Sequence, residues 1–180
     1  MTAIRDRGEA RRTLVDGALA AAGLLGEGPV LDVGSGGGSP GIPLASARPD
    51  LDFVLLEARR RKCDFLEKIA AGFENVSAIC ERAEEHAAGA GRDAYGTAVA
   101  RALAAPPVAA EWCLPLVRPG GLAVLFAGPT ADLDAVSKAA AEVAAEVEES
   151  LAGFILLRKT GPTPDRFPRR PGVAKKRPLA

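Results

Sequence analysis

The sequence predicts an α/β fold in which helices cover both faces of a mostly parallel, seven-stranded sheet and an antiparallel hairpin closes its C-terminal end. Two observations carry this prediction. Apolar segments with strand character alternate along the chain with helical segments of about ten residues, the pattern of successive β-α-β units. The last two strand segments have no helix between them, so they are expected to pair as a hairpin.

The helices and strands are expected in alternation after an N-terminal helix. Residues 9–25 carry apolar positions at helical spacing and run into GEGP, where Gly and Pro end a helix. Residues 30–33 form a buried strand that leads into a glycine-rich turn, and a helix over 43–48 has its Pro in the first turn, where Pro is tolerated. The remaining predicted strands are 52–56, 76–80, 95–100, 121–127, 146–150 and 153–159, and the remaining helices are 61–71, 82–88, 107–117 and 131–145.

Length and charge indicate one domain with a basic extension. The chain has 180 residues with 23 Lys/Arg and 23 Asp/Glu. Eight of the cations and one Asp fall between Arg158 and Ala180, which leaves 15 cations against 22 acids elsewhere. We therefore expect an N-terminal helical segment over 1–28, a ligand-binding domain over 29–160 and a Pro-rich extension over 161–180. The five prolines of this extension should prevent helix and keep it extended.

The cysteines and the N-terminus favour a cytoplasmic protein. Cys63, Cys80 and Cys113 are odd in number and lack C-x-x-C spacing, so the sequence predicts neither a disulfide nor a zinc site. No apolar run approaches the roughly 20 residues of a membrane span, and the N-terminus MTAIRDRGEARR lacks the apolar segment of a signal peptide. We expect a monomer that binds no metal and no membrane.

The strongest local signal is the turn LDVGSGGGSPG over 31–41. A strand delivers this turn to the carboxyl edge of the sheet, where open α/β sheets bind ligands, and glycines there let the backbone approach a ligand. The dinucleotide fingerprint G-x-G-x-x-G would place its third Gly at position 39, which is Ser. The spacing Gly34-x-Gly36-x-Gly38 is instead typical of S-adenosylmethionine sites, whose ligand has no pyrophosphate.

Glu57 is the second element of this predicted site. It ends the second strand, where a carboxylate can accept both ribose hydroxyl hydrogens of a nucleoside. Nicotinamide enzymes use the same device, so Glu57 does not choose between cofactors. The alternative is a surface acid that faces the run of cations over 59–62, which itself either contacts phosphate or is a solvated face.

Four stretches together resemble the guanine-N7 methyltransferases of bacterial small-subunit ribosomal RNA, the family once called glucose-inhibited division protein B. They are LDVGSGGGSPGIPLA (31–45), LLEARRRKCDFLEKI (55–69), ERAEEHA (81–87) followed by ARA (100–102), and FPRRPGVAKKRPL (167–179). The resemblance implies a Rossmann-like class I methyltransferase fold, S-adenosylmethionine as cofactor, and methylation of 16S rRNA or of the small ribosomal subunit in the cytoplasm.

The resemblance also implies roles for individual residues. Gly34 and Ser39 of the loop and the segments beside ribose and adenine would bind the cofactor, and Arg101 would lie between cofactor and target base. Together with the glycine turn, the predicted cofactor residues are Gly34, Ser35, Gly36, Gly38, Ser39, Glu57, Ala58, Ala83, Glu84 and Arg101. The tail resembles an RNA-binding extension, with Arg169, Arg170, Lys175, Lys176 and Arg177 as predicted RNA residues, and we expect it to leave cofactor affinity unchanged. The alternative for the tail is a disordered basic segment.

The expected chemistry needs no general base, because guanine N7 attacks with a free lone pair. His86, the one histidine, is expected to be a solvated helix residue, and Cys80 a strand residue of the core. Arg101 is expected to orient the reactants through its planar guanidinium. The alternative for Arg101 is a structural role beside a nearby acid.

The chain departs from the family in three places. It begins inside the N-terminal helical region of the family, it reads TLVDG over 13–17 where the family has His-Leu-x-Asp-Ser, and it has Ala127 where a Lys is common. These departures keep a second hypothesis open, a relative that binds cofactor and RNA without catalysis. A third, a nicotinamide-dependent oxidoreductase, is disfavoured by the early third Gly and by the absence of a Tyr-x-x-x-Lys motif.

Overall fold

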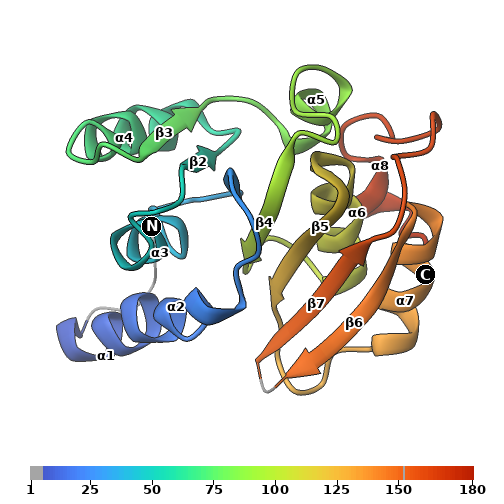
Figure 1. The fold of residues 1–180 in the computed structure, drawn as a ribbon, viewed down its shortest axis with the longest axis horizontal. Helices are drawn as coiled ribbons and strands as arrows, with labels where there is room; N and C mark the ends of the chain where they lie inside the picture. The colour runs from blue at the N-terminus through green and yellow to red at the C-terminus, as the bar shows by residue number, and fades with distance from the viewer. Residues whose placement is uncertain (1–5, 152) are drawn as a thin grey trace.

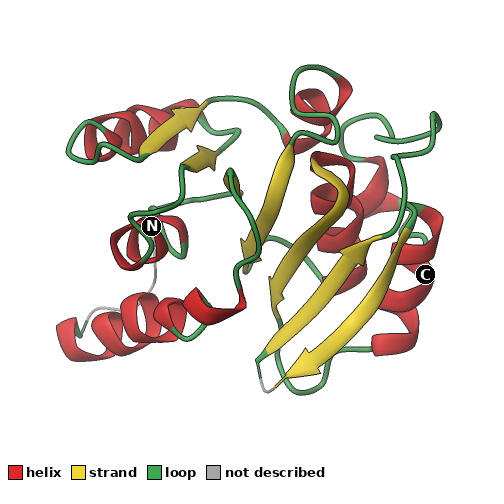
Figure 2. Cartoon of the chain, in the orientation of Figure 1, coloured by secondary structure: helices red, strands yellow, loops and turns green. Residues whose placement is uncertain are grey.

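The computed structural model describes residues 6–151 and 153–180 and contains a seven-stranded mixed sheet with helices on both faces (Figures 1 and 2). The strand order is β3-β2-β1-β4-β5-β7-β6; the first five strands of this order are parallel, and β7 pairs antiparallel with both neighbours. The strands are β1 (Val30–Val33), β2 (Phe53–Leu56), β3 (Val76–Ile79), β4 (Tyr95–Arg101), β5 (Val117–Phe126), β6 (Ala145–Leu151) and β7 (Phe154–Lys159). The predicted fold class is confirmed.

The alternation of side chains along β1 divides the core into two layers. Val30 packs with Leu44 of α3 and Phe53 of β2, while Leu31 and Val33 pack on the opposite face. That opposite face is covered by α6 and α7, and the N-terminal segment joins α3 on the first face. A strand with both faces covered buries all its residues, as β1 does.

The helices lie close to their predicted positions. The N-terminal segment is irregular: α1 (Arg7–Arg11) passes through a π-helical turn (Arg12–Asp16) into α2 (Gly17–Leu19) and a 3₁₀ turn (Ala22–Leu24). Residues 1–5 of the predicted N-terminal segment lie outside the described residues. The other helices are α3 (Gly41–Ala47), α4 (Arg60–Ala70), α5 (Ala83–Ala88), α6 (Pro106–Cys113) with a 3₁₀ turn (Leu114–Leu116), α7 (Leu133–Glu142) and α8 (Val173–Lys176).

The C-terminal extension is folded onto the body, so the prediction of an extended tail without helix is wrong. Arg92 donates to the carbonyls of Phe167 (2.6 Å) and Thr163 (2.7 Å). Buried Lys159 donates to Thr163 Oγ1 (2.6 Å) and lies 3.3 Å from Asp93. Four of the five prolines precede α8 and Pro178 follows it, so α8 itself contains none. The Phe167 side chain is buried, so packing as well as local propensity decides the tail's conformation.

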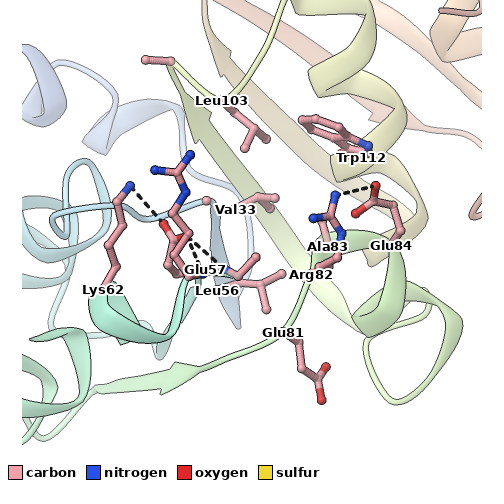
Figure 3. A pocket seen from close by; sticks show the side chains of 14 residues that line it. Val33, Leu56, Glu57, Lys62, Glu81, Arg82, Ala83, Glu84, Leu103 and Trp112 are labelled. Atoms are coloured by element: carbon pink, nitrogen blue, oxygen red, sulfur yellow. Dashed lines mark hydrogen bonds and ion pairs between the residues drawn. The ribbon is translucent and has the colours of Figure 1, made fainter. Parts of the chain in front are cut away.

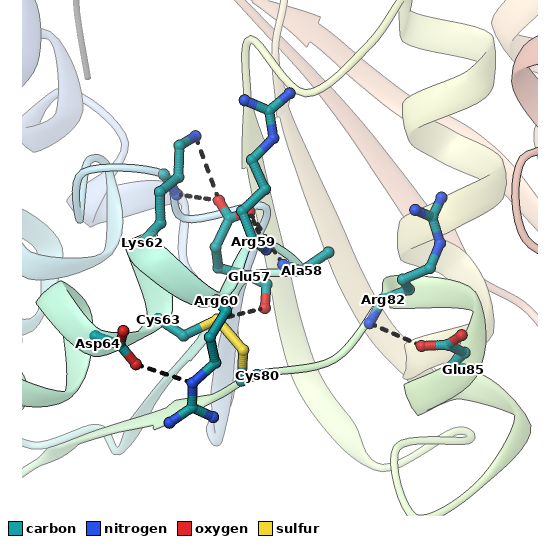
Figure 4. The surroundings of a disulfide bond; sticks show 11 residues. Glu57, Ala58, Arg59, Arg60, Lys62, Cys63, Asp64, Cys80, Arg82 and Glu85 are labelled. Atoms are coloured by element: carbon teal, nitrogen blue, oxygen red, sulfur yellow. Dashed lines mark hydrogen bonds and ion pairs between the residues drawn. A yellow bond between two sulfur atoms is a disulfide. The ribbon is translucent and has the colours of Figure 1, made fainter.

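The expectation that the cysteines form no disulfide is also wrong. Cys63 in the first turn of α4 and Cys80 just after β3 are joined, with their Cα atoms 5.6 Å apart (Figure 4). The α4–β3 connection folds back on itself, so two residues 17 positions apart become neighbours. The spacing of the two cysteines along the sequence does not indicate that they meet in the fold. Cys113 is a buried free thiol.

His86 is buried, not solvated as expected. Its Nδ1 lies 2.8 Å from Glu81 Oε2 and its Nε2 lies 2.7 Å from the Tyr95 hydroxyl oxygen. The acidic sequence around it predicted an exposed helix, but α5 presents this position to β4. Burial is possible because both ring nitrogens find polar partners.

Within 6–151 and 153–180, no helix is long and apolar enough to cross a membrane. The same residues contain no group of three or more His, Cys, Asp or Glu side chains arranged to hold a metal ion.

Reduction of the Cys63–Cys80 bond is expected to lower the free energy of unfolding by roughly 3 kcal/mol, the loop-closure entropy for a loop of this size. Urea unfolding with and without reductant measures the difference. Thiol titration of the urea-unfolded protein should give one reactive thiol before reduction and three after it. As a control, reductant should not shift the unfolding of the Cys63→Ser/Cys80→Ser variant. Three reactive thiols in untreated protein would contradict the bond.

Candidate active site

A pocket of about 410 Å³ opens at the carboxyl edge of the sheet (Figure 3). It lies beside β1 and β4, where the strand order reverses, and this switch point is where open α/β sheets bind ligands. Its walls come from the ends of β1 and β2 and from the segments that follow β3 and β4. The lining residues are Val33, Gly34, Leu56, Glu57, Ala58, Arg59, Lys62, Glu81, Arg82, Ala83, Glu84, Ala102, Leu103 and Trp112.

The glycine-rich turn after β1 reaches this pocket at Gly34. Gly34, Gly36 and Gly38 have φ values of +74°, +59° and +92°, in the left-handed region that side chains rarely adopt. A Cβ at Gly34 would also lie 2.4 Å from Leu103 Cδ1. The sequence therefore requires glycine here both for the backbone turn and for the close approach of the β4 side of the pocket.

The Glu57 carboxylate ties this loop to the end of β2. Its Oε2 accepts from the Gly36 N–H (3.0 Å) and lies 3.5 Å from Lys62 Nζ, while its Oε1 accepts from the N–H groups of Ala58 (3.0 Å) and Arg59 (2.9 Å) (Figure 4). Only 7% of Glu57 is exposed, so it is not the surface acid of the alternative interpretation.

The opposite wall is formed by the start of α5 and one side chain of α6. Ala83 and Trp112 supply apolar surface, and Figure 3 shows them across the pocket from Glu57. Glu84 is 6% exposed, and its Oε1 accepts from Arg82 Nη2 (3.4 Å) and from the Gly172 N–H of the tail (2.9 Å). The pocket is thus bounded by two buried carboxylates, both neutralised by hydrogen bonds and a neighbouring cation.

Arg101, at the end of β4, lies beyond the pocket lining and joins the loop to the N-terminal segment. Its Nη2 donates to the Thr13 carbonyl (2.6 Å) and its Nη1 to Ser39 Oγ (3.3 Å), while the guanidinium lies over the Phe126 ring at 5.7 Å. Ser39 Oγ in turn donates to the Leu14 carbonyl (2.6 Å). Partial burial lowers the Arg101 pKa, and among the described residues it forms no ion pair with an acid.

Comparison with known proteins identifies the family. The sequence model of the family described as rRNA small subunit methyltransferase G (GidB) matches residues 1–156. The chain belongs to this family. The Deinococcus radiodurans protein of that name is 42% identical over 176 residues, which cover 87% of this chain and 68% of the relative. The Moorella thermoacetica protein is 36% identical over 197 residues, which cover 99% and 82% of the two chains.

Solved methyltransferase structures share the fold of this methyltransferase G family member. A 16S rRNA methyltransferase of T. thermophilus, solved with AdoMet and guanosine, has a TM-score of 0.54 at 21% identity over 78% of this chain and 37% of that one. The CcbJ methyltransferase of Streptomyces caelestis has a TM-score of 0.53 at 21% identity over 69% and 56% of the two chains. At these identities the likeness shows the class I methyltransferase fold alone.

The pocket of this family member brings together only part of the predicted cofactor set. Gly34, Glu57, Ala58, Ala83 and Glu84 line it. The remaining predicted residues, which lie in the loop beyond Gly34 or at the end of β4, are Ser35, Gly36, Gly38, Ser39 and Arg101, and they do not line it. Ser35 is buried and donates to the Asp32 carbonyl (2.8 Å), so its hydroxyl stabilises the turn from within. Cofactor roles for this second group stay predictions.

Sequence reasoning missed the apolar part of the lining and left the role of the basic run over 59–62 open. Trp112, the only tryptophan of the sequence, was not predicted as a lining residue, because it lies within an apolar helical segment far along the chain from the glycine turn. Leu103 directly follows the Arg101-Ala102 pair, so its place just after a parallel strand could have predicted that it lies at the carboxyl edge of the sheet. Arg59 and Lys62 line the pocket, whereas Arg60 pairs with Asp64 (2.9 Å), so the basic run divides into pocket and surface positions.

The tail cations of this methyltransferase G family member also divide into two groups. Arg170, Lys175, Lys176 and Arg177 are exposed, as RNA contacts require. Arg169 instead forms a two-armed ion pair with Glu111, whose side chain is 3% exposed, with both N–O distances 2.5 Å. Arg169 therefore has a packing partner already, and its role in RNA binding stays a prediction.

Asp32 was not predicted as a site residue. It lies beneath the glycine loop and accepts a hydrogen bond from the end of that loop. It is 1% exposed; Oδ2 accepts from the Gly41 N–H (2.9 Å) at the start of α3, and Oδ1 is a buried oxygen without a partner among the described residues. This bond explains why α3 begins at Gly41, two residues before the predicted Pro43. Burial raises the Asp32 pKa from 3.8 to about 7, against the opposing effect of the Gly41 bond.

The pH dependence of the free energy of unfolding should reflect the ionisation of Asp32. Between pH 3.8 and about 7 the folded chain keeps a proton that the unfolded chain has lost. This contribution is therefore fully present below about pH 4 and is lost as the pH rises through about 7, with a slope of up to about 1.4 kcal/mol per pH unit. Urea unfolding of wild type and Asp32→Asn from pH 4 to 8 should show the slope reduced in the variant. Parallel profiles would show that Asp32 is ionised throughout.

Proposed function

We propose that this chain is an S-adenosylmethionine-dependent methyltransferase that transfers a methyl group to N7 of a guanine in 16S rRNA. The observation that carries the proposal is the family match over residues 1–156, because this range includes the glycine loop, Glu57, Glu84 and Arg101. The N7 position rests on the resemblance of the four stretches that contain these residues, and it is the finer part of the proposal.

Three features of the pocket support S-adenosylmethionine as its ligand. At the glycine loop, Gly34 lines the pocket and brings no side chain into it, which supports a place for the amino-acid end of the ligand beside this backbone. Glu57 lines the pocket at the end of β2, where a ribose would be held, and Lys62, 3.5 Å from Oε2, is the one of its four donors that a ribose hydroxyl could replace. The apolar wall of Ala83, Leu103 and Trp112 offers a flat surface for adenine.

The bound cofactor supplies an electrophilic methyl group on a sulfonium, and the chain's own residues have to place the acceptor. Guanine N7 carries a free lone pair, so no side chain has to remove a proton. This agrees with the state of His86, whose two ring nitrogens are already occupied by Glu81 and Tyr95. Catalysis then depends on orientation, which is worth several orders of magnitude in rate when two reactants are held in line.

The substrate side of the proposal rests on the exposed cations. Arg170, Lys175, Lys176 and Arg177 present positive charge on the tail, and each phosphate that they neutralise releases counterions from RNA. We propose 16S rRNA or the small subunit as partner, a monomeric enzyme, and the three-part division at residues 28 and 160. We propose a cytoplasmic location on the same grounds, although the Cys63–Cys80 bond is unusual for that compartment.

One observation favours a second candidate, an RNA-binding relative without catalysis. Ala127 stands at the end of β5 where the family commonly has Lys, and its N–H donates to the Gly153 carbonyl (3.0 Å). A cation is therefore absent from a position at the same sheet edge as Arg101. No described residue favours the oxidoreductase alternative, and family membership argues against it.

The deciding experiment is single-turnover transfer of labelled methyl from S-adenosylmethionine to small subunits from cells that lack this gene, followed by mass mapping of the labelled nucleotide. Label on N7 of one 16S guanine supports the proposal. Tight cofactor binding with no incorporation into subunits or free rRNA would support the second candidate. Calorimetric binding of NAD without binding of S-adenosylmethionine would overturn the assignment of the cofactor.

Substitution within the glycine loop should separate two neighbouring positions. Gly36→Val is expected to weaken S-adenosylmethionine binding at least tenfold, because valine at a φ of +59° displaces the N–H that Glu57 holds. Gly37→Ala is the matched control: Gly37 is exposed, lies outside the positive-φ set and has no atom within 4 Å of a new Cβ. Calorimetry and circular dichroism measure affinity and folding. Equal affinities for the two folded variants would mean that the loop is misassigned.

Arg101 should be intolerant of a charge-conserving substitution. Lysine cannot span the Thr13 carbonyl and Ser39 Oγ together, so Arg101→Lys is expected to be nearly as slow as Arg101→Ala, with each losing on the order of 100-fold in single-turnover rate. Cofactor affinity measured in parallel distinguishes orientation of the acceptor from damage to the loop. A Lys variant close to wild type would show that charge alone matters, and two unaffected variants would show a structural arginine.

A further inference from the structure

The tip of the C-terminal tail contacts the wall of the cofactor pocket. The Gly172 N–H donates to Glu84 Oε1 at 2.9 Å, a contact between residues 88 positions apart. Glu84 lines the pocket and is 6% exposed, and Gly172 has a φ of +80°, which lets the backbone turn toward it just before α8. The shorter of the two hydrogen bonds to this pocket carboxylate therefore comes from the tail, at 2.9 Å against 3.4 Å for Arg82 Nη2.

A buried ion pair holds the tail tip in this position. Arg169 binds both carboxylate oxygens of Glu111, which is 3% exposed and stands next to Trp112 on α6. A carboxylate at that depth needs its partner, because an unpaired buried charge is strongly destabilising. Arg169 and Gly172 thus contact the two elements, α6 and α5, from which the adenine-side wall is built.

The root of the tail is anchored separately. Arg92 holds the carbonyls of Thr163 and Phe167, Lys159 holds Thr163, and the Phe167 side chain is buried in the main core cluster. Figure 1 shows the tail, in red, running beside α5 and α6. Loss of the tip contacts should therefore release the tip without detaching the root.

We propose that Arg169 and Gly172 are positioning residues of the cofactor site, so that the tail which presents the RNA-binding cations also sets cofactor affinity. This inference rests on the proposed function and goes beyond it. It reverses the expectation that the tail leaves cofactor affinity alone. The docked tip fixes the Glu84 carboxylate and the Glu111–Trp112 turn of α6, while Arg170 and Lys175 on either side of Gly172 remain exposed to an RNA ligand.

The test is the affinity of the full chain for S-adenosylhomocysteine and S-adenosylmethionine by calorimetry. Arg169→Ala is expected to weaken binding about tenfold or more, the scale of one hydrogen bond to a charged group. Arg166→Ala is the matched control: Arg166 lies in the same tail, but its ion pair is an exposed one with Glu142 (2.6 Å) at the end of α7 and involves neither Glu84 nor Glu111. Its affinity should equal that of wild type.

A second variant separates positioning from loss of stability. Arg169→Ala/Glu111→Gln removes the unpaired buried charge, so its thermal midpoint should recover toward wild type while its cofactor affinity stays weak. The KM for S-adenosylmethionine should rise with the Kd while kcat at saturation is kept, which is the signature of lost ground-state binding.

The outcomes are distinct. Wild-type affinity in folded Arg169→Ala, or in the double variant where the single one does not fold, overturns the positioning role and leaves the proposed function intact. Equal weakening in Arg166→Ala overturns it too, because the effect would then belong to tail charge in general. A wild-type chain that binds neither ligand overturns the proposed function and this inference with it.

Discussion

The pocket depends on one buried carboxylate. Glu57 accepts hydrogen bonds from the backbone of Gly36, Ala58 and Arg59, and so it holds the end of β2, the start of α4 and the glycine loop in one arrangement. A buried carboxylate is costly without partners, and here three N–H groups and the Lys62 ammonium compensate it. Because the loop has left-handed glycines, its backbone can bring an N–H to this oxygen without moving β1. The loop beside the pocket is therefore held by hydrogen bonds from within the chain.

The opposite wall also contains buried carboxylates that hydrogen bonds compensate, but they have partners from the tail. Glu84 and Glu111 are buried at the ends of α5 and α6, and both are satisfied by the tail, one by a backbone N–H and the other by an arginine. The tail lies beyond the residues that the family model matches, which end at 156. A segment outside that range is thus in contact with a wall of the pocket within it. The tail and the wall of the pocket are therefore parts of one hydrogen-bonded structure.

Chemistry at the carboxyl edge is matched to this architecture. A nucleophile with its own lone pair has to be positioned by the protein but needs no proton transfer. Two titratable groups near the pocket have their hydrogen-bond partners inside the fold and are not free to act as a base. His86 is sequestered between Glu81 and Tyr95, and Asp32 supports the first turn of α3 from inside. Arg101 joins β4, the loop and the N-terminal segment through the two hydrogen bonds of its planar guanidinium.

The sequence by itself determined the succession of helices and strands along the chain, the glycine turn and the carboxylate after β2. These features depend on local periodicity and on glycine's backbone freedom. The sequence also determined the family, through short strings that surround the pocket. Only the tertiary structure decided which carboxylates are buried, that Cys63 and Cys80 meet, that His86 is enclosed, and that Arg169 turns inward while Arg170 turns outward. These features arise between residues that are distant along the chain, such as Gly172 and Glu84. Their energies come from burial and pairing, which no local pattern encodes.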